Sequence, residues 1–144
     1  MTEWKAQDPD YIERMKRYAS SPIMKDFFGV EFIGAEPGAV RLGLDNRPEL
    51  GHRPGWFEGA VTSMLGQMGA SWACGTLAQK DWTLLTLELS TKFVGAARGE
   101  RLVAKGRVIQ AGRTISFGTA DVFVIHGGAE NLCATVSTTC RRHS

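Results

Sequence analysis

The segment around residues 52–60 carries the groups that could do chemistry. A loop with two prolines and two glycines, residues 46–56, runs into a helix predicted to begin near Phe57, so the loop delivers polar side chains to a helix N-terminus. Unpaired amides at a first helical turn, here those of Glu58, Gly59 and Ala60, can stabilise negative charge that develops on a carbonyl oxygen. The small residues Gly59 and Ala60 could let a substrate approach the helix, or they could only let the helix pack closely on a sheet. The residue types are consistent with both interpretations.

Other reactive groups are poorly set for catalysis. Their spacing predicts no metal site among His52, His126, His143, Cys74, Cys133 and Cys140. The run His126-Gly127-Gly128 lies between two predicted strands and indicates a turn. Ser71 lies inside a predicted helix, away from the strand-turn-helix setting of a serine nucleophile. Nucleotide-binding loops of the GxGxxG and GxxxxGK types do not occur in the sequence.

Length and composition indicate one domain of ordinary size. With 144 residues, 43% of them hydrophobic and 22% charged, the chain can bury a core without a cofactor or disulfide. A net charge of +2 does not favour nucleic acid as the partner. The most apolar stretch, residues 57–78, is interrupted by Glu58, Gln67 and glycines, so we expect no membrane span. Three cysteines and the absence of an apolar leader predict a reduced, cytoplasmic protein.

The sequence of the first third of the chain predicts helical segments followed by two strands. Asp8 and Pro9 resemble a helix start, and Pro22 and Gly29 bracket a further helical turn. We interpret residues 8–28 as an N-terminal helical cover with no assigned chemistry. Residues 30–36 and 39–46 read as two strands joined by a turn.

The central helix and the strands after it define the fold class. The helix has an apolar stripe, and its other faces are nearly bare, with Gly59, Gly66 and Gly69, so something packs on both sides. Residues 83–93 alternate with period two and predict a half-buried strand, and residues 101–110, 114–125 and 132–140 extend a meander with a turn at 126–131. We therefore predict an α+β fold in which a curved antiparallel sheet wraps around one long central helix, as a single domain over residues 1–144.

Several motifs resemble those of a known family. They are EGAVTSMLGQMGAS at 58–71, TLELSTKF at 86–93, GAARGE at 95–100 and AGRTISFGTADVFV at 111–124. In order and spacing, over residues 40–140, the chain resembles hotdog-fold acyl-CoA thioesterases of the phenylacetate-degradation branch. The resemblance implies a hotdog fold, a homodimer or homotetramer, and hydrolysis of CoA thioesters without a cofactor other than the CoA of the substrate.

The chain departs from the family pattern at its polar positions. The family opens its helix with an Asn three residues before a Gly, then His-Gly-Gly, and later an acid. Matching Gly55 and Leu65 to that pattern places His52 at the Asn position and Glu58 at the His position. The same match places Gly59 and Ala60 at the Gly pair and Gln67 at the acid, so the implied catalytic set is His52, Glu58, Gly59 and Gln67.

A neutral amide at position 67 cannot take a proton at pH 7, so Gln67 can only orient water or substrate. Glu58 or His52 could activate water instead, although a first-turn carboxylate satisfying the helix dipole and a loop histidine without a role explain them too. Nine residues of helix separate Glu58 from Gln67 by about 13 Å. A two-fold axis between antiparallel helices would bring them together, so we expect the site between subunits.

Cations are expected to hold the CoA phosphates. Arg113 in AGRT and Arg98 in GAARGE are the candidates, whereas Arg101, Lys105 and Arg107 more simply keep a strand face soluble. The remaining predicted substrate contacts are Thr86, Ala60 and Trp56.

The sequence therefore predicts an acyl-CoA thioesterase with a non-standard catalytic set. Its partners would be an acyl-CoA and a second copy of the chain, with no nucleic acid and no membrane. The alternatives are a hotdog protein that binds acyl-CoA or another apolar ligand without turnover, and a hotdog dehydratase.

Overall fold

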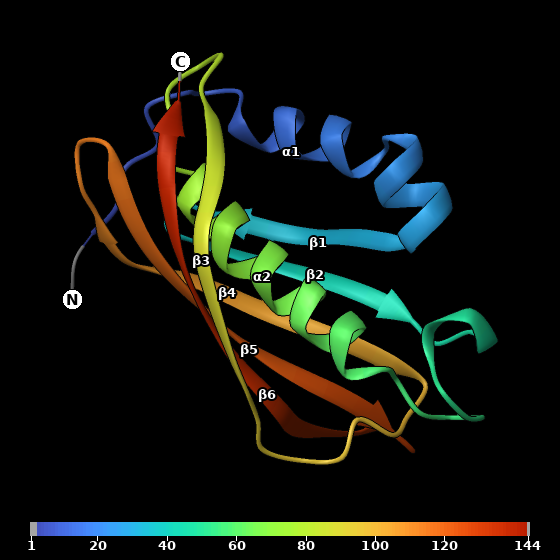
Figure 1. The fold of residues 1–144 in the computed structure, drawn as a ribbon. Coiled ribbons are helices and arrows are strands. Elements are labelled where there is room, and N and C mark those ends of the chain that lie inside the picture. The colour runs from blue at the N-terminus through green and yellow to red at the C-terminus, as the bar shows by residue number, and fades with distance from the viewer. Residues whose placement is uncertain (1–2, 144) are drawn as a thin grey trace.

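The structure is a computed structural model and describes residues 3–143. Its elements in chain order are α1 (Tyr11–Ala19), η1 (Pro22–Phe28), β1 (Val30–Glu36), β2 (Ala39–Asp45), η2 (Pro48–Leu50), α2 (Gly59–Gly75), β3 (Thr83–Phe93), β4 (Arg101–Ala111), β5 (Ile115–His126) and β6 (Ala129–His143). The strands form one antiparallel sheet in the order β1-β2-β4-β5-β6-β3. The sheet curves around α2 (Figure 1), which confirms the predicted hotdog fold.

The predicted strands 30–36, 39–46, 101–110 and 114–125 are confirmed within one or two residues. The turn at the end of β5 is tighter than predicted: His126 pairs with Ala129 across Gly127 and Gly128. Both glycines have positive φ, +57° and +81°, as a two-residue hairpin requires. His126 is exposed in this turn, beside Glu100.

The strand β3 does not follow the predicted meander, because it pairs with β6 at the edge of the sheet. The neighbours of β4 are β2 and β5, so β3 does not pair with the strand that follows it and lies instead on the outer side of β6. The half-buried pattern is also wrong, since Leu85, Leu87, Leu89 and Phe93 are all exposed. An edge strand has no hydrogen-bonded neighbour on one side. These apolar side chains of β3 are therefore not covered by another part of the chain that the structure describes.

A bulge between Thr86 and Glu88 explains which side chains of β3 reach the helix. Thr86 contacts Gln67 of α2, and Thr91 contacts Ser63 of α2 with 2.5 Å between the hydroxyl oxygens. Two residues five apart point to opposite faces of a regular strand. The extra residue in the bulge restores both to the face that meets α2.

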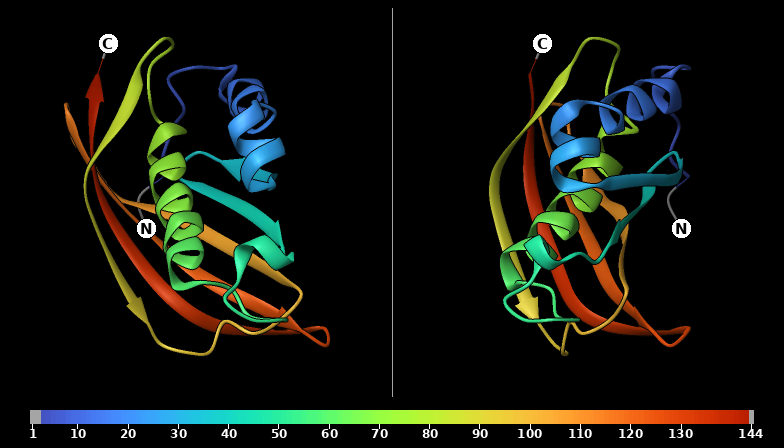
Figure 2. Two further views of the ribbon diagram at one scale, coloured as in Figure 1. Left: turned by 45° about the vertical axis from the view of Figure 1, so that its right-hand side comes forward. Right: turned by 90° about the vertical axis from the view of Figure 1, so that its right-hand side faces the viewer.

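The helix α2 packs with its backbone close to the concave face of the sheet (Figure 2). A Cβ on Gly106 would overlap the carbonyl group of Gly69, and one on Gly118 would meet the carbonyl oxygen of Ala70 at 2.5 Å. These glycines allow helix and sheet to touch, which leaves Leu65, Ala73 and Cys74 fully buried. Close packing therefore explains much of the bare surface that the sequence predicted for this helix.

The N-terminal cover crosses the C-terminal half of α2 and lies beside β1 (Figure 2). Asp8 does not cap a helix at Pro9; its Oδ1 accepts a hydrogen bond from the Asp10 amide at 2.9 Å, and α1 begins at Tyr11. Arg14 anchors the helix, donating from Nε to Asp8 Oδ2 at 3.0 Å and from Nη2 to the carbonyl oxygen of Gly75 at 3.2 Å. The segment η1 ends at Phe28 and is capped by Gly29, whose φ is +77°.

Candidate active site

His52 and Glu58 meet at the N-terminal end of α2. The Nδ1 atom of His52 lies 3.4 Å from Glu58 Oε2, and both side chains are about half exposed, at 49% and 55%. The loop that carries His52 is held by the Glu58 amide, which donates to the carbonyl oxygen of Leu50 at 2.8 Å. The structure thus brings together the two titratable residues that the sequence nominated, in a histidine–carboxylate pair that water can reach.

The amides of the first turn of α2 differ from the sequence expectation at one position. The Glu58 amide is engaged by Leu50 and cannot serve as an oxyanion donor, which corrects that part of the prediction. The carbonyl oxygen of Glu58 accepts from the amides of Val61 and Thr62, as a helix start should. Within residues 3–143 the amides of Gly59 and Ala60 have no backbone partner, so these two remain as donors. The Phe93 ring lies against Gly59, 3.3 Å from where a Cβ would be.

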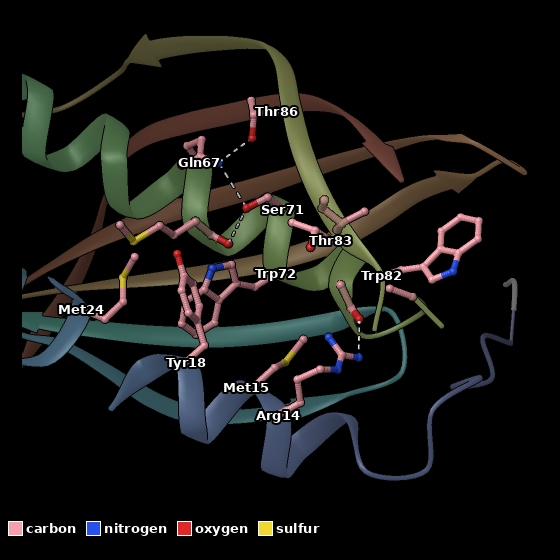
Figure 3. Close-up of a pocket in the computed structure, with 14 residues that line it drawn as sticks. Arg14, Met15, Tyr18, Met24, Gln67, Ser71, Trp72, Trp82, Thr83 and Thr86 are labelled. Carbon is pink, nitrogen blue, oxygen red and sulfur yellow. Dashed lines mark hydrogen bonds between the residues drawn. The ribbon is translucent and has the colours of Figure 1, made fainter. Parts of the chain in front are cut away.

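Gln67 lies at the middle of α2 and is held by two hydroxyls (Figure 3). Its Nε2 donates to Thr86 Oγ1 at 2.9 Å and to Ser71 Oγ at 3.2 Å. The Ser71 hydroxyl in turn donates to the carbonyl oxygen of Met68 at 3.3 Å. Both N–H groups of the Gln67 amide are therefore used, and its carbonyl oxygen is the group left to accept a hydrogen bond from water or substrate.

A cavity of about 460 Å³ opens beside Gln67, between α1, η1, the C-terminal half of α2 and the start of β3 (Figure 3). Its size is typical of small-molecule sites. Sequence reasoning missed most of it, because it placed Ser71 inside a predicted helix and assigned no part of a site to Tyr18 or Trp72. The four-residue spacing of Gln67 and Ser71, which puts them on one helix face, was the available signal.

Trp56 and Arg98 are neighbours near the N-terminal end of α2, joined by an antiparallel bridge. The same two segments are linked by hydrogen bonds from the Phe57 amide to the Ala97 carbonyl and from the Gly99 amide to the Gly55 carbonyl. The guanidinium of Arg53 stacks over the Trp56 ring, 4.4 Å from its centroid. Trp56 therefore sits in a cationic environment beside the His52–Glu58 pair, whose imidazole centroid is 6.1 Å from its ring.

Arg113 lies far from Arg98, because the two residues flank opposite ends of the strand β4. Arg113 lines a second cavity, of about 470 Å³, together with Trp4, Trp82 and Arg142. The Nε atom of Arg142 is buried there without a hydrogen-bond partner among the described residues. One chain thus places one predicted CoA-binding arginine at each end of the molecule.

Cys74, Cys133 and Cys140 are free thiols buried from solvent, so none of them is accessible as a nucleophile. Burial raises the pKa of Cys133 to about 11, whereas a hydrogen bond with Cys74 lowers the pKa of Cys140 to about 6. Over residues 3–143 no group of three metal-ligating side chains comes together. In the same part of the chain, no helix has the length and apolar character needed to cross a membrane.

Comparison with solved structures supports the fold. A thioesterase family protein from Silicibacter pomeroyi superimposes with a TM-score of 0.85 at 24% identity, covering 92% of this chain and 97% of that one. A phenylacetic acid degradation-related protein from Ralstonia eutropha gives a TM-score of 0.76 at 19% identity, with 91% and 98% coverage. Zebra fish thioesterase superfamily member 2 gives 0.72 at 23% identity, with 90% and 93% coverage.

The amino-acid sequence was also compared with curated proteins and with family profiles. No curated protein matches it significantly. A sequence profile of the thioesterase superfamily matches residues 55–130, more than half of the chain and the part that holds α2, Glu58 and Gln67. The chain belongs to the thioesterase superfamily, as the motifs at 58–71 and 86–93 indicated.

Proposed function

We propose that the protein hydrolyses an acyl-CoA thioester to a free acid and CoA, at sites formed between two copies of the chain. The observation that carries the proposal is the arrangement along α2. The His52–Glu58 pair and the Gly59 and Ala60 amides lie at its N-terminus, whereas Gln67 lies nine residues on, beside an apolar cavity. The N-terminus of α2 therefore holds a base and the donors for an oxyanion, and the position of Gln67 holds a group that can orient water or substrate.

The pair supplies the base. With Glu58 orienting the imidazole through Nδ1, His52 takes a proton from water, and the resulting hydroxide attacks the thioester carbonyl carbon. Negative charge then develops on the carbonyl oxygen, where the Gly59 and Ala60 amides and the positive end of α2 stabilise it. When the intermediate collapses, the C–S bond breaks and the proton returns from His52 to the CoA sulfur. Gln67 orients the water or the thioester through its free carbonyl oxygen.

A second copy of the chain completes the site. Glu58 and Gln67 are separated by about 13 Å of helix, too far to act on one carbonyl within a chain. The edge strand β3 presents a row of exposed apolar side chains, Leu87, Leu89 and Phe93, next to this part of α2, and the exposed Val94 follows it directly. Pairing of two β3 edges would cover that row and set the two α2 helices antiparallel, Glu58 of one toward Gln67 of the other.

Arginines at both ends of the molecule supply the charge that CoA requires. Arg113, with Arg142 beside it, is the first candidate for the phosphates, and Arg98 is the second. Thr86 contributes by holding Gln67, and Trp56 and Ala60 lie at the thioester end of the site. We expect no cofactor besides the CoA of the substrate and a cytoplasmic location.

Thiol release tests the proposal. Purified protein is incubated with acetyl-, octanoyl-, palmitoyl- and phenylacetyl-CoA, and free CoA is followed with a thiol reagent. Turnover of at least one thioester, lost in the Glu58→Gln variant, is the expected result. Binding of these thioesters without thiol release would reject hydrolysis.

That second outcome corresponds to another function. A binding protein that retains acyl-CoA without turnover is favoured by one observation: the position of the family's acid is a glutamine fixed by Ser71 and Thr86. Dissociation constants measured on the same panel separate it from an inactive protein that binds nothing.

A further inference from the structure

The cavity beside Gln67 is roofed by the N-terminal cover and has mostly apolar walls. Tyr18 of α1 and Trp72 of α2 pack against each other in its wall, with ring centroids 5.2 Å apart and planes tilted by 47° (Figure 3). Three methionines complete the walls, one each from α1, η1 and α2: Met15, Met24 and Met68. Unbranched thioether side chains adapt to a flexible apolar guest.

The two ends of the cavity differ in chemistry. Gln67, Ser71 and Thr86 form a polar end, where the proposed function places the thioester. The far end is formed by Gly75, Arg14 and Trp82. Arg14 is already paired with Asp8 and bonded to the carbonyl oxygen of Gly75, so its charge is compensated. The far end thus favours a methyl terminus over a carboxylate.

The length of the cavity follows from the helix that lines it. Gln67 and Gly75 are eight residues apart on α2, which corresponds to about 12 Å along its axis. An extended hydrocarbon chain advances about 1.25 Å per C–C bond of about 1.5 Å, so about ten bonds, or roughly ten carbons, span this distance.

We propose that this cavity holds the acyl group of the substrate, and that the N-terminal cover, through Met15 and Tyr18, selects unbranched acyl chains of roughly ten carbons. The inference rests on the proposed function for the position of the thioester. It gives residues 8–28, to which the sequence assigned no chemistry, a role in substrate selection.

Gly75 offers a variant that shortens the cavity without strain. A Cβ there would lie 3.5 Å from Met15 Cε and 3.8 Å from Leu84 Cδ1, which are ordinary contacts with the ends of flexible side chains. Gly75→Ala adds one methyl group at the far end of the cavity and favours the helical backbone. Tyr18→Ala instead removes part of the roof. Phe27→Ala is the matched control, because Phe27 is an exposed aromatic residue of the same cover and does not line the cavity.

The experiment measures binding and hydrolysis separately. Non-hydrolysable thioether analogues of acyl-CoAs with 4 to 16 carbons, an arylacetyl analogue and an ω-carboxyl octyl analogue are titrated by calorimetry; these chain lengths are set around the roughly 10 carbons expected from the helix rise. Thiol release is recorded for the matching thioesters. Circular dichroism verifies that each variant is folded.

We expect affinity of the wild-type protein to rise about fourfold per added methylene up to roughly ten carbons and then to level off. Gly75→Ala should shift that plateau one to two carbons shorter and weaken ten-carbon binding by about four- to fifteenfold, with four-carbon binding unchanged. Tyr18→Ala should flatten the dependence, and Phe27→Ala should match the wild type.

An unshifted profile in folded Gly75→Ala and Tyr18→Ala would overturn the inference, as would tightest binding of the arylacetyl or ω-carboxyl analogue. The failure of the proposed function looks different. Chain-length-dependent binding that responds to the variants, with no thiol released from any thioester, would reject hydrolysis and leave the acyl site standing. Thiol release together with an unshifted chain-length profile in the variants would instead support hydrolysis and reject the acyl site.

Discussion

The side-chain amide of Gln67 donates to Thr86 Oγ1 across 2.9 Å and so ties the central helix α2 to the edge strand β3. The bulge in β3 makes this contact possible together with the Ser63–Thr91 contact one helical turn away. Gln67 is therefore a fixed group at the junction of helix, edge strand and cavity, and its role can be tested by changing its chemistry while keeping its shape.

Gln67→Glu replaces the amide by a carboxylate of the same shape. The hydroxyls of Ser71 and Thr86 can rotate to donate to it, so we expect little change in melting temperature. In the Glu58→Gln background the new carboxylate should act as a base and raise thioester hydrolysis about 10- to 100-fold, a part of what positioned bases contribute. Steady-state kinetics of the single and double variants measure this. An equally inactive double variant would show that water does not approach position 67.

Glu58→Gln should lower kcat by about 10² to 10⁴, because the imidazole of His52 loses the carboxylate that orients it. Stability should fall by less than about 1 kcal/mol, since an exposed carboxylate at a helix N-terminus contributes little. His52→Gln should have a comparable kinetic effect. Glu49→Gln, an exposed carboxylate of the same loop region, serves as the control. A Glu58→Gln enzyme with wild-type kcat would leave Glu58 only its role at the helix dipole.

Charge on the β3 edge should disrupt self-association. Leu89→Lys places an ammonium group in the exposed apolar row, where pairing of two edges would bury it unpaired. We expect a shift toward the monomer mass in light scattering and a parallel loss of thioesterase activity. Ile33→Lys makes the same change on β1, at the opposite edge of the sheet, and should leave mass and activity unaltered. A fully active Leu89→Lys monomer would refute the shared site.

The anchor of the N-terminal cover should be acid-sensitive. Hydrogen bonds from the Asp10 amide and the Arg14 guanidinium lower the pKa of Asp8 below its ordinary value of 3.8. A depressed pKa means that the stabilisation is fully present above pH 3.8 and is lost as the pH falls through the folded-state pKa. Wild-type protein should exceed Asp8→Asn in stability at pH 7, and the gap should close as the pH falls from 3.8 through the folded-state pKa of Asp8.

Chemical denaturation at several pH values checks this, with Asp10→Asn as the control, since no side-chain bond of Asp10 caps α1. A stability difference between wild type and Asp8→Asn that stays constant with pH would contradict the anchor.

Local patterns predicted the strands and the central helix well, because alternation and the 3.6-residue stripe depend only on residues close together in the sequence. The strand at 83–93 shows what such local patterns cannot predict. Its bounds are correct, yet its partner β6 lies some fifty residues away and its bulge depends on contacts of Thr86 and Thr91 with α2. Alternation alone put Leu85 and Leu87 on one buried side, whereas the edge position leaves them exposed.

The site was predictable only in part for the same reason. The loop and helix start at 52–60 are contiguous, so His52, Glu58 and the helix amides could be nominated together. The occupied amide of Glu58 depends on Leu50, and the cavity depends on Tyr18 meeting Trp72 across 54 residues of sequence. Contacts between distant segments of this kind leave no local pattern.

Subunit complementation tests the central claim most directly. Glu58→Gln and Gln67→Ala proteins, each of low activity, are mixed, dissociated and allowed to reassociate, and thioester hydrolysis is compared with that of each alone. If Glu58 of one chain serves the site of Gln67 on the other, half of the reassociated dimers are mixed, and each mixed dimer holds one intact site of two. The activity should then recover to about one quarter of the wild-type value. A mixture no more active than the sum of its components would contradict a hydrolytic site shared between two chains.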